Sequence, residues 1–522
     1  MTYLDHVLEL RRSIAGVGEA MSHRAWETAA GYIHTARSVP QEILEGSFAL
    51  AMVPTSDYPD APAVTLELAT GELTQIFVRD FKQATESKDM PNVTRYFKLF
   101  PLIGQETAGL DIYSRFISGI ISDQSRQLMT TTTTNQHDAA MFYAVATSRL
   151  FENIATIAAQ HAPVVSRHYG PGRMLYVIDK IQDQADLQGG LIIDTFWDQR
   201  GLDRILNDIR NYAFPYLVKS FTVAASGGTV TGHVGPSRTG TPMLNDDEFG
   251  VTTPMANNAE DAQYLKSIGG LINETTVMLN RWMLYCKFLA LHWPEYAGDK
   301  ANNTDNDNKF NNNNNDSITL IIPKLIKESN YAKKISTKLA PFYDTLMTFF
   351  FRRSVEKAFQ LDDAPPQNQD YTVESPLVTS VVDDVMYIFS SMMHQSLSTG
   401  DLALVRVTLG NIRRVLESDY IGLLQRRLRD GNPRNMVLEN VNLITFRNGS
   451  THGRFAGISL SDESKLRKFL INMNNLAVTG NYIDRILLNV MGDLGDKLPF
   501  SDDASQVSRT LDALAKSVKA RA

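Results

Sequence analysis

Apolar residues recur along this chain at three-, four- and seven-residue steps, and this spacing constrains the fold more than any other feature of the sequence. Residues spaced in this way share one face of an α-helix. The first stripe begins almost at residue 1 and comprises Leu4, Val7, Leu8 and Ile14. Further stripes include Leu73 with Phe77 and Phe81, Tyr113 with Ile117 and Ile121, and Leu265 with Ile268 and Ile272. The spacing predicts an almost entirely α-helical chain.

Strand signals are weak by comparison. The stretches 65–68 and 220–223 have residue types found in strands, but neither belongs to a run of hairpins or alternates with helices in a βαβ pattern. No repeat of about 20–50 residues is strong enough to indicate a solenoid. We therefore predict the all-α class, with consecutive helical bundles.

Proline, glycine and asparagine divide the chain into blocks. Three prolines fall between residues 52 and 65, and nine asparagines lie between Asn302 and Asn315. Segments of this kind cannot bury enough apolar surface to form a core. We predict a helical segment at 1–51, a bundle at 66–221, a flexible loop at 222–258, a bundle at 259–360 with a disordered insertion at 299–317, and a bundle at 377–522.

Composition narrows the range of functions. The 51 basic and 58 acidic residues give a formal charge of −7, which does not indicate a nucleic-acid-binding protein. The single cysteine, Cys286, excludes a disulfide framework within the chain and every Cys-rich zinc module. The N-terminus lacks the pattern of a secretory signal, and the most apolar runs are far shorter than the roughly 20 residues of a membrane span. We expect a soluble, cytosolic protein.

No group of residues has a spacing suited to catalysis or to holding a cofactor or metal. The run Tyr169–Arg173 has two glycines but lacks the lysine and hydroxyl of a phosphate loop, so it predicts a turn that ends a helix. His161 and His168 have no carboxylate or thiolate nearby in the sequence. Cys286 lies in an apolar, aromatic run, which indicates a buried structural thiol. We predict no catalytic, cofactor-binding or metal-binding residue.

Two basic clusters leave another interpretation open. One runs from Lys324 to Lys338, and the other comprises Arg426, Arg427, Arg429 and Arg434. Such clusters contact acidic proteins or anionic lipids in some proteins, but neither reaches the charge density of a polybasic anchor, which favours solvated helix faces. A helical adaptor that binds acidic surfaces through Lys324–Lys338 stays an alternative, as does an all-helical enzyme with an unfamiliar fold.

Four segments resemble a known family. Arg95–Gly104 is similar to the R-F-F-K-I-F-P-L-L-G element of subunit 4 of the conserved oligomeric Golgi complex, and Tyr169–Arg173 resembles that family's Y-Y-G-P-G-R turn. Val382–Ile388 resembles its V-D-D-V-F-Y-I helix, and Leu416–Tyr420 its L-E-S-D-F. The segments occur in the family's order, and the resemblance extends from about residue 20 to about residue 515.

The chain also departs from the family pattern. The family has an N-terminal coiled-coil region before the point that corresponds to residue 1, and C-terminal helical bundles after the point at which this chain ends. The ranges 222–258 and 299–317 are similar to insertions that shorter members lack. The resemblance therefore implies a fragment of a longer protein.

The resemblance implies a non-catalytic subunit of a multisubunit vesicle tether, with stacked antiparallel bundles that form an elongated rod. Such a complex captures vesicles at Golgi membranes in retrograde traffic within the Golgi, supports the assembly of SNARE proteins and indirectly supports glycosylation. The implied partners are subunits 1, 2 and 3 of the same lobe, a Golgi syntaxin and its SM-family regulator. The implied location is peripheral, on the cytosolic face of the Golgi membrane.

The motif residues are the candidate site residues, and most of them have an expected structural role. They are Arg95, Phe97, Phe100, Pro101, Gly104, Gly170, Pro171, Gly172, Arg173, Asp383, Asp384, Tyr387, Glu417 and Asp419. Asp383 and Asp384 would point about 100° apart on a helix, so we place them near a helix start rather than around one ion. The stripe Leu4, Val7 and Leu8 is the candidate surface for pairing with a partner helix.

Overall fold

The computed structural model describes residues 3–130, 140–222, 258–298, 320–363, 376–432, 460–494, 498 and 501–521. Within these ranges every regular element is a helix, and no strand is present. The described parts of the two strand-like stretches, 65–68 and 220–222, lie inside helices. The prediction of an all-α fold is therefore confirmed.

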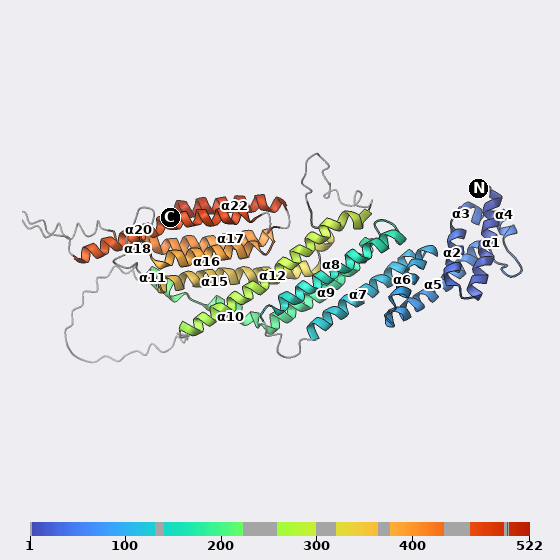
Figure 1. The fold of residues 1–522 in the computed structure, drawn as a ribbon, viewed down its shortest axis with the longest axis horizontal. Helices are drawn as coiled ribbons and strands as arrows, with labels where there is room; N and C mark the ends of the chain where they lie inside the picture. The colour runs from blue at the N-terminus through green and yellow to red at the C-terminus, as the bar shows by residue number, and fades with distance from the viewer. Residues whose placement is uncertain are drawn as a thin grey trace, which may run out of the picture.

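The molecule is elongated, with the N-terminal helices at one end and the C-terminal bundle at the other (Figure 1). The N-terminal unit consists of α1 (Tyr3–Ser22), α2 (Trp26–Arg37), α3 (Gln41–Leu44) and α4 (Ser47–Met52). The face that α2 buries contains Ala29, Ala30 and Ala36. Because alanine side chains are small, α1 and α2 pack closely together.

The middle of the molecule is a row of antiparallel helices. Its elements are α5 (Pro62–Glu86), α6 (Met90–Leu102), α7 (Glu106–Thr130), α8 (Phe142–Tyr169) and α9 (Met174–Gln199). The hydroxyl of Tyr176 in α9 donates to Asp111 in α7 at 3.3 Å. Twelve residues further along α9, Gln188 donates to Ser122 of α7 at 3.4 Å. The two helices therefore run in the same direction, with α8 between them in sequence running the opposite way.

One long helix joins the middle row to the C-terminal bundle. This helix, α12 (Asn258–Ala297), has 40 residues and is therefore about 60 Å long. Its first half contacts α15 (Ala340–Gln360), where Asp261 pairs with Arg353. Its second half lies along α8, where Tyr285 stacks on Phe151 at a ring distance of 4.8 Å. Packing thus continues from one part of the molecule into the next.

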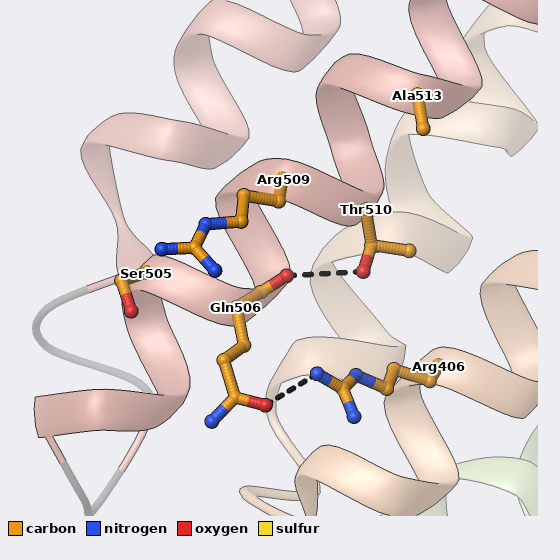
Figure 2. Close-up of a pocket in the computed structure, with 6 residues that line it drawn as sticks. All are labelled: Arg406, Ser505, Gln506, Arg509, Thr510 and Ala513. Carbon is orange, nitrogen blue, oxygen red and sulfur yellow. Dashed lines mark hydrogen bonds between the residues drawn. The ribbon is translucent and has the colours of Figure 1, made fainter.

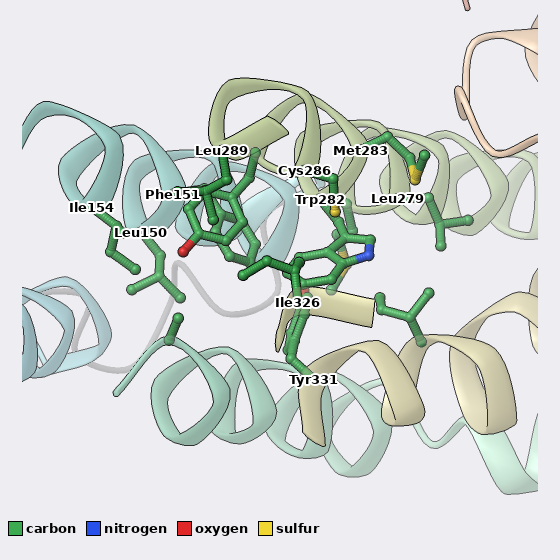
Figure 3. Packing of buried hydrophobic residues seen from close by; sticks show 14 of the residues in the cluster. Leu150, Phe151, Ile154, Leu279, Trp282, Met283, Cys286, Leu289, Ile326 and Tyr331 are labelled. Carbon is green, nitrogen blue, oxygen red and sulfur yellow. The ribbon is translucent and has the colours of Figure 1, made fainter. Parts of the chain in front are cut away.

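The core between α8 and α12 is rich in aromatic residues (Figure 3). Phe151 of α8 and Trp282 of α12 both contact Tyr331, whose ring lies 5.3 Å and 4.9 Å from theirs. Cys286 is 1% exposed in this core, which confirms the prediction of a buried thiol. Burial raises the pKa of Cys286, so the thiol stays protonated at neutral pH.

Shorter helices connect these parts. They are α10 (Leu202–Asn211), α11 (Pro215–Thr222), α13 (Lys324–Lys327), α14 (Asn330–Lys334) and the π-helical turn η2 (Ile335–Leu339), which continues into α15. Ser329 caps α14 by accepting a hydrogen bond from the backbone N–H of Ala332 at 3.1 Å.

The C-terminal bundle alternates in direction like the middle row. Its helices are α16 (Ser380–Leu397), α17 (Leu402–Val415), the π-helical turn η3 (Leu416–Ile421), α18 (Gly422–Asp430), α20 (Leu460–Gly492) and α22 (Ser501–Arg521). Asn475 of α20 accepts from the N–H of Thr379 at 3.0 Å, and Tyr482 of α20 donates to Asp383 at 2.8 Å. These contacts give α16 and α20 the same direction, as an antiparallel bundle requires.

The predicted low-complexity segments fall almost entirely outside the described residues. Only Thr222 and Asn258, at the two ends of the 222–258 loop, belong to described helices, and the whole of 299–317 lies outside. The domain boundaries therefore stay predictions. None of the helices in the described ranges is long and apolar enough to cross a membrane.

Candidate functional site

The predicted N-terminal surface is divided between two faces of α1. Val7 is 3% exposed in the core, whereas Leu4 and Leu8 are 55% and 57% exposed. Residues three or four positions apart lie in adjacent rows on a helix. The sequence pattern therefore placed Leu4, Val7 and Leu8 in one stripe. Val7 is a core residue, and the candidate surface is corrected to the outer row of α1, Leu4 and Leu8.

The first motif packs α6 against its neighbours. Phe97 and Phe100 are completely buried. Nε of Arg95 lies 2.6 Å from Oε1 of Glu27 in α2, and this hydrogen bond raises the pKa of Arg95. Pro101 lies inside the last turn of α6, which ends one residue later at Leu102. The proline therefore lies at the end of the helix.

An aromatic cluster explains why Phe97 belongs to a motif. Its ring stacks between those of Tyr113 and Tyr169, at centroid distances of 3.8 Å and 4.5 Å. The hydroxyl of Tyr169 donates to the backbone oxygen of Phe97 at 2.7 Å, and the hydroxyl of Tyr113 contacts Nδ1 of His161. Burial lowers the pKa of His161, so its neutral form is favoured. The cluster joins α6, α7 and α8.

The glycine motif forms the turn that the sequence predicts. α8 ends at Tyr169, and Gly170 and Gly172 adopt φ values of 90° and 78°, which favour glycine. A Cβ on Gly172 would lie 2.8 Å from the backbone oxygen of Ala297, so the turn and the end of α12 touch through their backbones. Arg173 then pairs with Glu106 at the start of α7 at 2.9 Å. Pro171 lies between the two glycines, and Gly104 similarly adopts φ 70° after α6.

The carboxylates of the third motif lie near a helix start, because α16 begins at Ser380. Asp383 accepts the hydrogen bond from Tyr482, and Asp384 is exposed. Tyr387 is 77% exposed and therefore differs from the buried aromatic residues of the first motif. These residues do not converge on a cavity.

The fourth motif places two buried carboxylates in η3. Glu417 accepts from Arg413 at 3.0 Å and from Ser517 of α22 at 2.6 Å. Asp419 accepts from Arg352 of α15 at 2.7 Å. Each carboxylate thus connects η3 to a neighbouring helix.

A buried charged cluster at α15 was missed at the sequence level. Glu356 is completely buried and accepts from the N–H groups of Tyr216 and Leu217, at 2.8 Å and 3.3 Å, at the start of α11. Arg353 donates to Glu356 at 2.7 Å and to Asp261 at 2.6 Å. The sequence does contain one indication of this cluster, because charged residues lie within the aromatic run that begins at Phe349.

A second buried carboxylate caps α8. Glu274 of α12 is 2% exposed, accepts from the N–H of Tyr143 at 2.9 Å and lies 3.3 Å from Arg200. Burial raises the pKa of Glu274, while Arg200 and the N–H donors act in the opposite direction. No local sequence pattern indicates this contact, because Tyr143 lies 131 residues before Glu274.

Part of each basic cluster is engaged within the chain. Lys334 and Lys338 lie 2.5 Å and 3.4 Å from the carboxylate of Asp194. Arg427 pairs with Asp362, whereas Arg434 lies outside the described residues. Lysines that already contact a carboxylate attract an anionic surface less strongly, so Lys334 and Lys338 give the adaptor interpretation little support, whereas Lys327 and Lys333 are exposed.

An open hollow of about 610 Å³ lies between α17 and α22 (Figure 2). Arg406 donates to Gln506 across it, and Arg509 lies on the α22 side. Its lining also includes Ser505, Thr510 and Ala513. The lining has hydroxyl groups but no histidine or carboxylate to act as a base. In the part of the chain that the structure describes, no group of three or more His, Cys, Asp or Glu residues could hold a metal ion.

Comparison with known families shows to which family the chain belongs. The family model described as "COG4 transport protein, middle alpha-helical bundle" matches residues 95–428, which is more than half of the chain. The chain belongs to the COG4 transport protein family. A second COG4 model, "Conserved oligomeric Golgi complex subunit 4, N-terminal", matches residues 1–55. All four sequence motifs lie inside the COG4 middle bundle, and the resemblance inferred from them is confirmed.

COG4 relatives match almost the entire chain. It is 27% identical over 516 residues to "Conserved oligomeric Golgi complex subunit 4" of Schizosaccharomyces pombe, covering 98% of this chain and 62% of that relative. The corresponding protein of Saccharomyces cerevisiae is 23% identical, with 98% of this chain and 61% of the relative covered. That of Mus musculus is 25% identical, with 94% and 56% covered. The chain thus spans less than two thirds of the length of these COG4 relatives. No solved structure matches it.

Proposed function

We propose that the chain is a non-catalytic, rod-forming subunit of a Golgi vesicle-tethering complex. The observation that carries this proposal is the match of 98% of the chain to relatives named as subunits of the conserved oligomeric Golgi complex. The elongated helical structure supports it, because a tether needs reach and stiffness (Figure 1). An α-helix advances about 1.5 Å per residue, so bundles placed end to end give that reach.

The contacts of the motif residues support a non-catalytic role. Glu417 and Asp419 are 8% and 6% exposed and accept hydrogen bonds from neighbouring helices. Phe97 fills the aromatic cluster, and Gly172 lets two backbones meet. Each of these residues therefore has a structural task that accounts for its presence in a motif.

The proposed partners are the other subunits of the complex, in the first place subunits 1, 2 and 3, together with a Golgi SNARE and an SM-family protein. The proposed location is peripheral, on the cytosolic face of the Golgi membrane. The proposed role is intra-Golgi retrograde transport through SNARE assembly, with glycosylation supported indirectly. The names of the relatives support membership of the complex, and the motif resemblance supports the rest.

The outer row of α1 is the proposed contact with another subunit. Leu4 and Leu8 are exposed one turn apart, on a helix whose opposite face is packed in the core. Burying two such leucines contributes about 1.5–3 kcal/mol each. Their loss should therefore weaken assembly by more than tenfold.

Co-purification of the assembled lobe tests both parts of the proposal. The Leu4→Asp/Leu8→Asp variant should recover at least tenfold less of the other subunits. Leu187→Asp/Leu191→Asp is the matched control, since these leucines of α9 have the same spacing and are 63% and 54% exposed. Full recovery with the α1 variant would refute the surface, and a wild-type chain that recovers none of the subunits would refute membership.

A further inference from the structure

The hollow between α17 and α22 lies within the length of both helices. At one end of it, Arg406 of α17 donates a hydrogen bond to the side chain of Gln506 in α22. Beyond its other end, Ser517 of α22 donates to Glu417 of η3 at 2.6 Å, and α22 continues to Arg521. The two helices are thus held together before and after the hollow, and the side chains between these contacts determine its size.

Small residues leave this space open. Ala513 lines the hollow on the α22 side. On α17, Gly410 follows Arg406 by one turn on the same face, and a Cβ at Gly410 would meet nothing within 4 Å. The volume of about 610 Å³ falls within the range of about 300–1,000 Å³ that is usual for small-molecule sites. The hollow is therefore large enough for a small organic ligand.

Two guanidinium groups give the hollow a positive charge. Arg406 and Arg509 belong to different helices and are both exposed. Figure 2 shows their guanidinium groups on either side of the Gln506 side chain. Arg406 uses one of its five N–H donors on the neutral oxygen of Gln506. In the described part of the chain Arg509 has no hydrogen-bond or ion-pair partner, so both arginines have donors available for an anion.

No carboxylate belongs to the lining and balances these charges. The rest of the lining consists of Ser505, Gln506, Thr510 and Ala513. Asp512 of α22 is exposed outside the lining, and Glu417 already accepts from Arg413 at 3.0 Å. Lys516 is exposed seven residues after Arg509, hence on the same face of α22, and adds a third cation beside the hollow. The surface around the hollow therefore carries more positive than negative charge.

We propose that this hollow binds a compact polyphosphate ester, either free in solution or as the head group of a membrane lipid. Arginine matches phosphate because its planar guanidinium donates two parallel hydrogen bonds to two phosphate oxygens. A phosphate monoester carries about 1.5–2 negative charges at neutral pH, so it displaces the neutral oxygen of Gln506 from Arg406. One phosphate meets Arg406 and another meets Arg509, and the volume of the hollow leaves room for the ring that joins them.

Calorimetric titration of the full chain with inositol trisphosphate tests the site. Binding should saturate at one ligand per chain and should weaken at least tenfold in Arg406→Ala/Arg509→Ala. The matched control is Arg204→Ala/Arg210→Ala, because these arginines are exposed on α10 and their removal changes the net charge equally. No saturable binding, or an equal loss in the control, overturns the proposal. Matching melting curves of the variants exclude misfolding as the cause of a loss.

A further double variant separates the shape of the guanidinium group from its charge. Arg406→Lys/Arg509→Lys keeps both charges but loses the paired donors. It should bind inositol trisphosphate at least threefold more weakly than the wild type, and more tightly than the alanine variant. If the lysine variant binds as tightly as the wild type, diffuse charge alone attracts the ligand, and recognition by the two arginines of the hollow is refuted.

Vesicle flotation distinguishes the two sources of the phosphate. Arginine-dependent flotation with phosphatidylcholine vesicles that contain phosphatidylinositol bisphosphate assigns the ligand to a lipid, and binding of soluble inositol trisphosphate alone assigns it to a free ester. Equal flotation with phosphatidylserine vesicles, which lack a phosphate monoester, overturns the proposal. A phosphoserine peptide that binds more tightly than inositol trisphosphate assigns the hollow to a phosphorylated protein and also overturns it. These measurements use the isolated chain, so their failure leaves the proposed role in the complex untouched.

Discussion

Two of the buried carboxylates in this chain lie where another helix begins. Glu356 of α15 meets the N–H groups of Tyr216 and Leu217, and Glu274 of α12 meets that of Tyr143. The first N–H groups of a helix have no partner within it and carry partial positive charge, so an anionic acceptor there is stabilising. Side chains distant in sequence therefore act as caps. Each carboxylate fixes one helix end against another helix.

Acidification should destabilise the fold through His161. Burial lowers the pKa of His161, so this residue contributes stability above its ordinary pKa of about 6.5, and that contribution is lost as the pH falls through the lower folded-state pKa. His161→Gln keeps a group that can accept from Tyr113 and removes the titration. We expect its melting temperature to fall less than that of the wild type between about pH 7 and pH 5.

Thermal unfolding across this pH range measures the effect. The control is His23→Gln, because His23 is exposed after the end of α1 and its substitution should leave the pH dependence unchanged. A His161→Gln variant that keeps the full wild-type dependence would contradict the assignment.

At the scale of the element, the turn between α8 and α9 joins two helices and also touches a third. Gly170 and Gly172 both require positive φ, but they differ in their surroundings. A Cβ at Gly170 meets nothing within 4 Å, whereas one at Gly172 lies 2.8 Å from the backbone oxygen of Ala297. The two glycines therefore separate the effect of backbone strain from that of helix packing.

Gly172→Ala should be more destabilising than Gly170→Ala. Strain from positive φ costs about 1–3 kcal/mol at either position, and Gly170, with φ 90° and ψ 168°, lies in a region essentially restricted to glycine. At Gly172 the turn must also move away from the end of α12, which should add about 1–2 kcal/mol in the free energy of unfolding. Urea denaturation of the two variants measures the difference, and equal losses would show that the contact with Ala297 is unimportant.

Local patterns in the sequence predict the elements well. Leu73, Phe77 and Phe81 follow the helical period and are all buried in α5, because burial of one face follows from that period. The turn at Gly170 was predictable for the same local reason, since glycine and proline chemistry ends helices. The family also followed from short motifs, whose residues fill buried positions such as that of Phe97.

Contacts between distant segments were not predictable in this way. Glu356 and Tyr216 are 140 residues apart, and no periodic pattern pairs them. Val7 was assigned to the partner-binding surface because adjacent rows of α1 have compatible spacing, and the helices packed against α1 decide which row is buried. The candidate surface was thus predicted to within one helix, and its correct face needed tertiary structure.

The shape of the whole molecule depends on α12, which contacts α15 with its first half and α8 with its second. We expect Leu284→Pro to bend the molecule, because proline removes a backbone hydrogen bond and clashes with the preceding turn. Leu284 is 43% exposed, so the loss of its side chain is a small part of the effect. Stability should fall by about 3 kcal/mol or more.

Small-angle X-ray scattering and thermal melting test this expectation. The maximum dimension should shorten in Leu284→Pro and stay unchanged in Leu284→Ala, which removes the side chain but keeps the helix. If the proline variant scatters like the wild type, α12 does not determine the shape of the molecule.

Because α12 packs against both α15 and α8, it affects how the molecule carries a mechanical load. Bundles joined by linkers would bend at each junction, and a load on one end would fold the chain before it reached the other. Here the hydrogen-bonded backbone of α12 runs from its first turns beside α15, where Asp261 pairs with Arg353, to Ala297 beside the turn after α8. A force on the middle row is therefore carried through the packed contacts of α12 into α15.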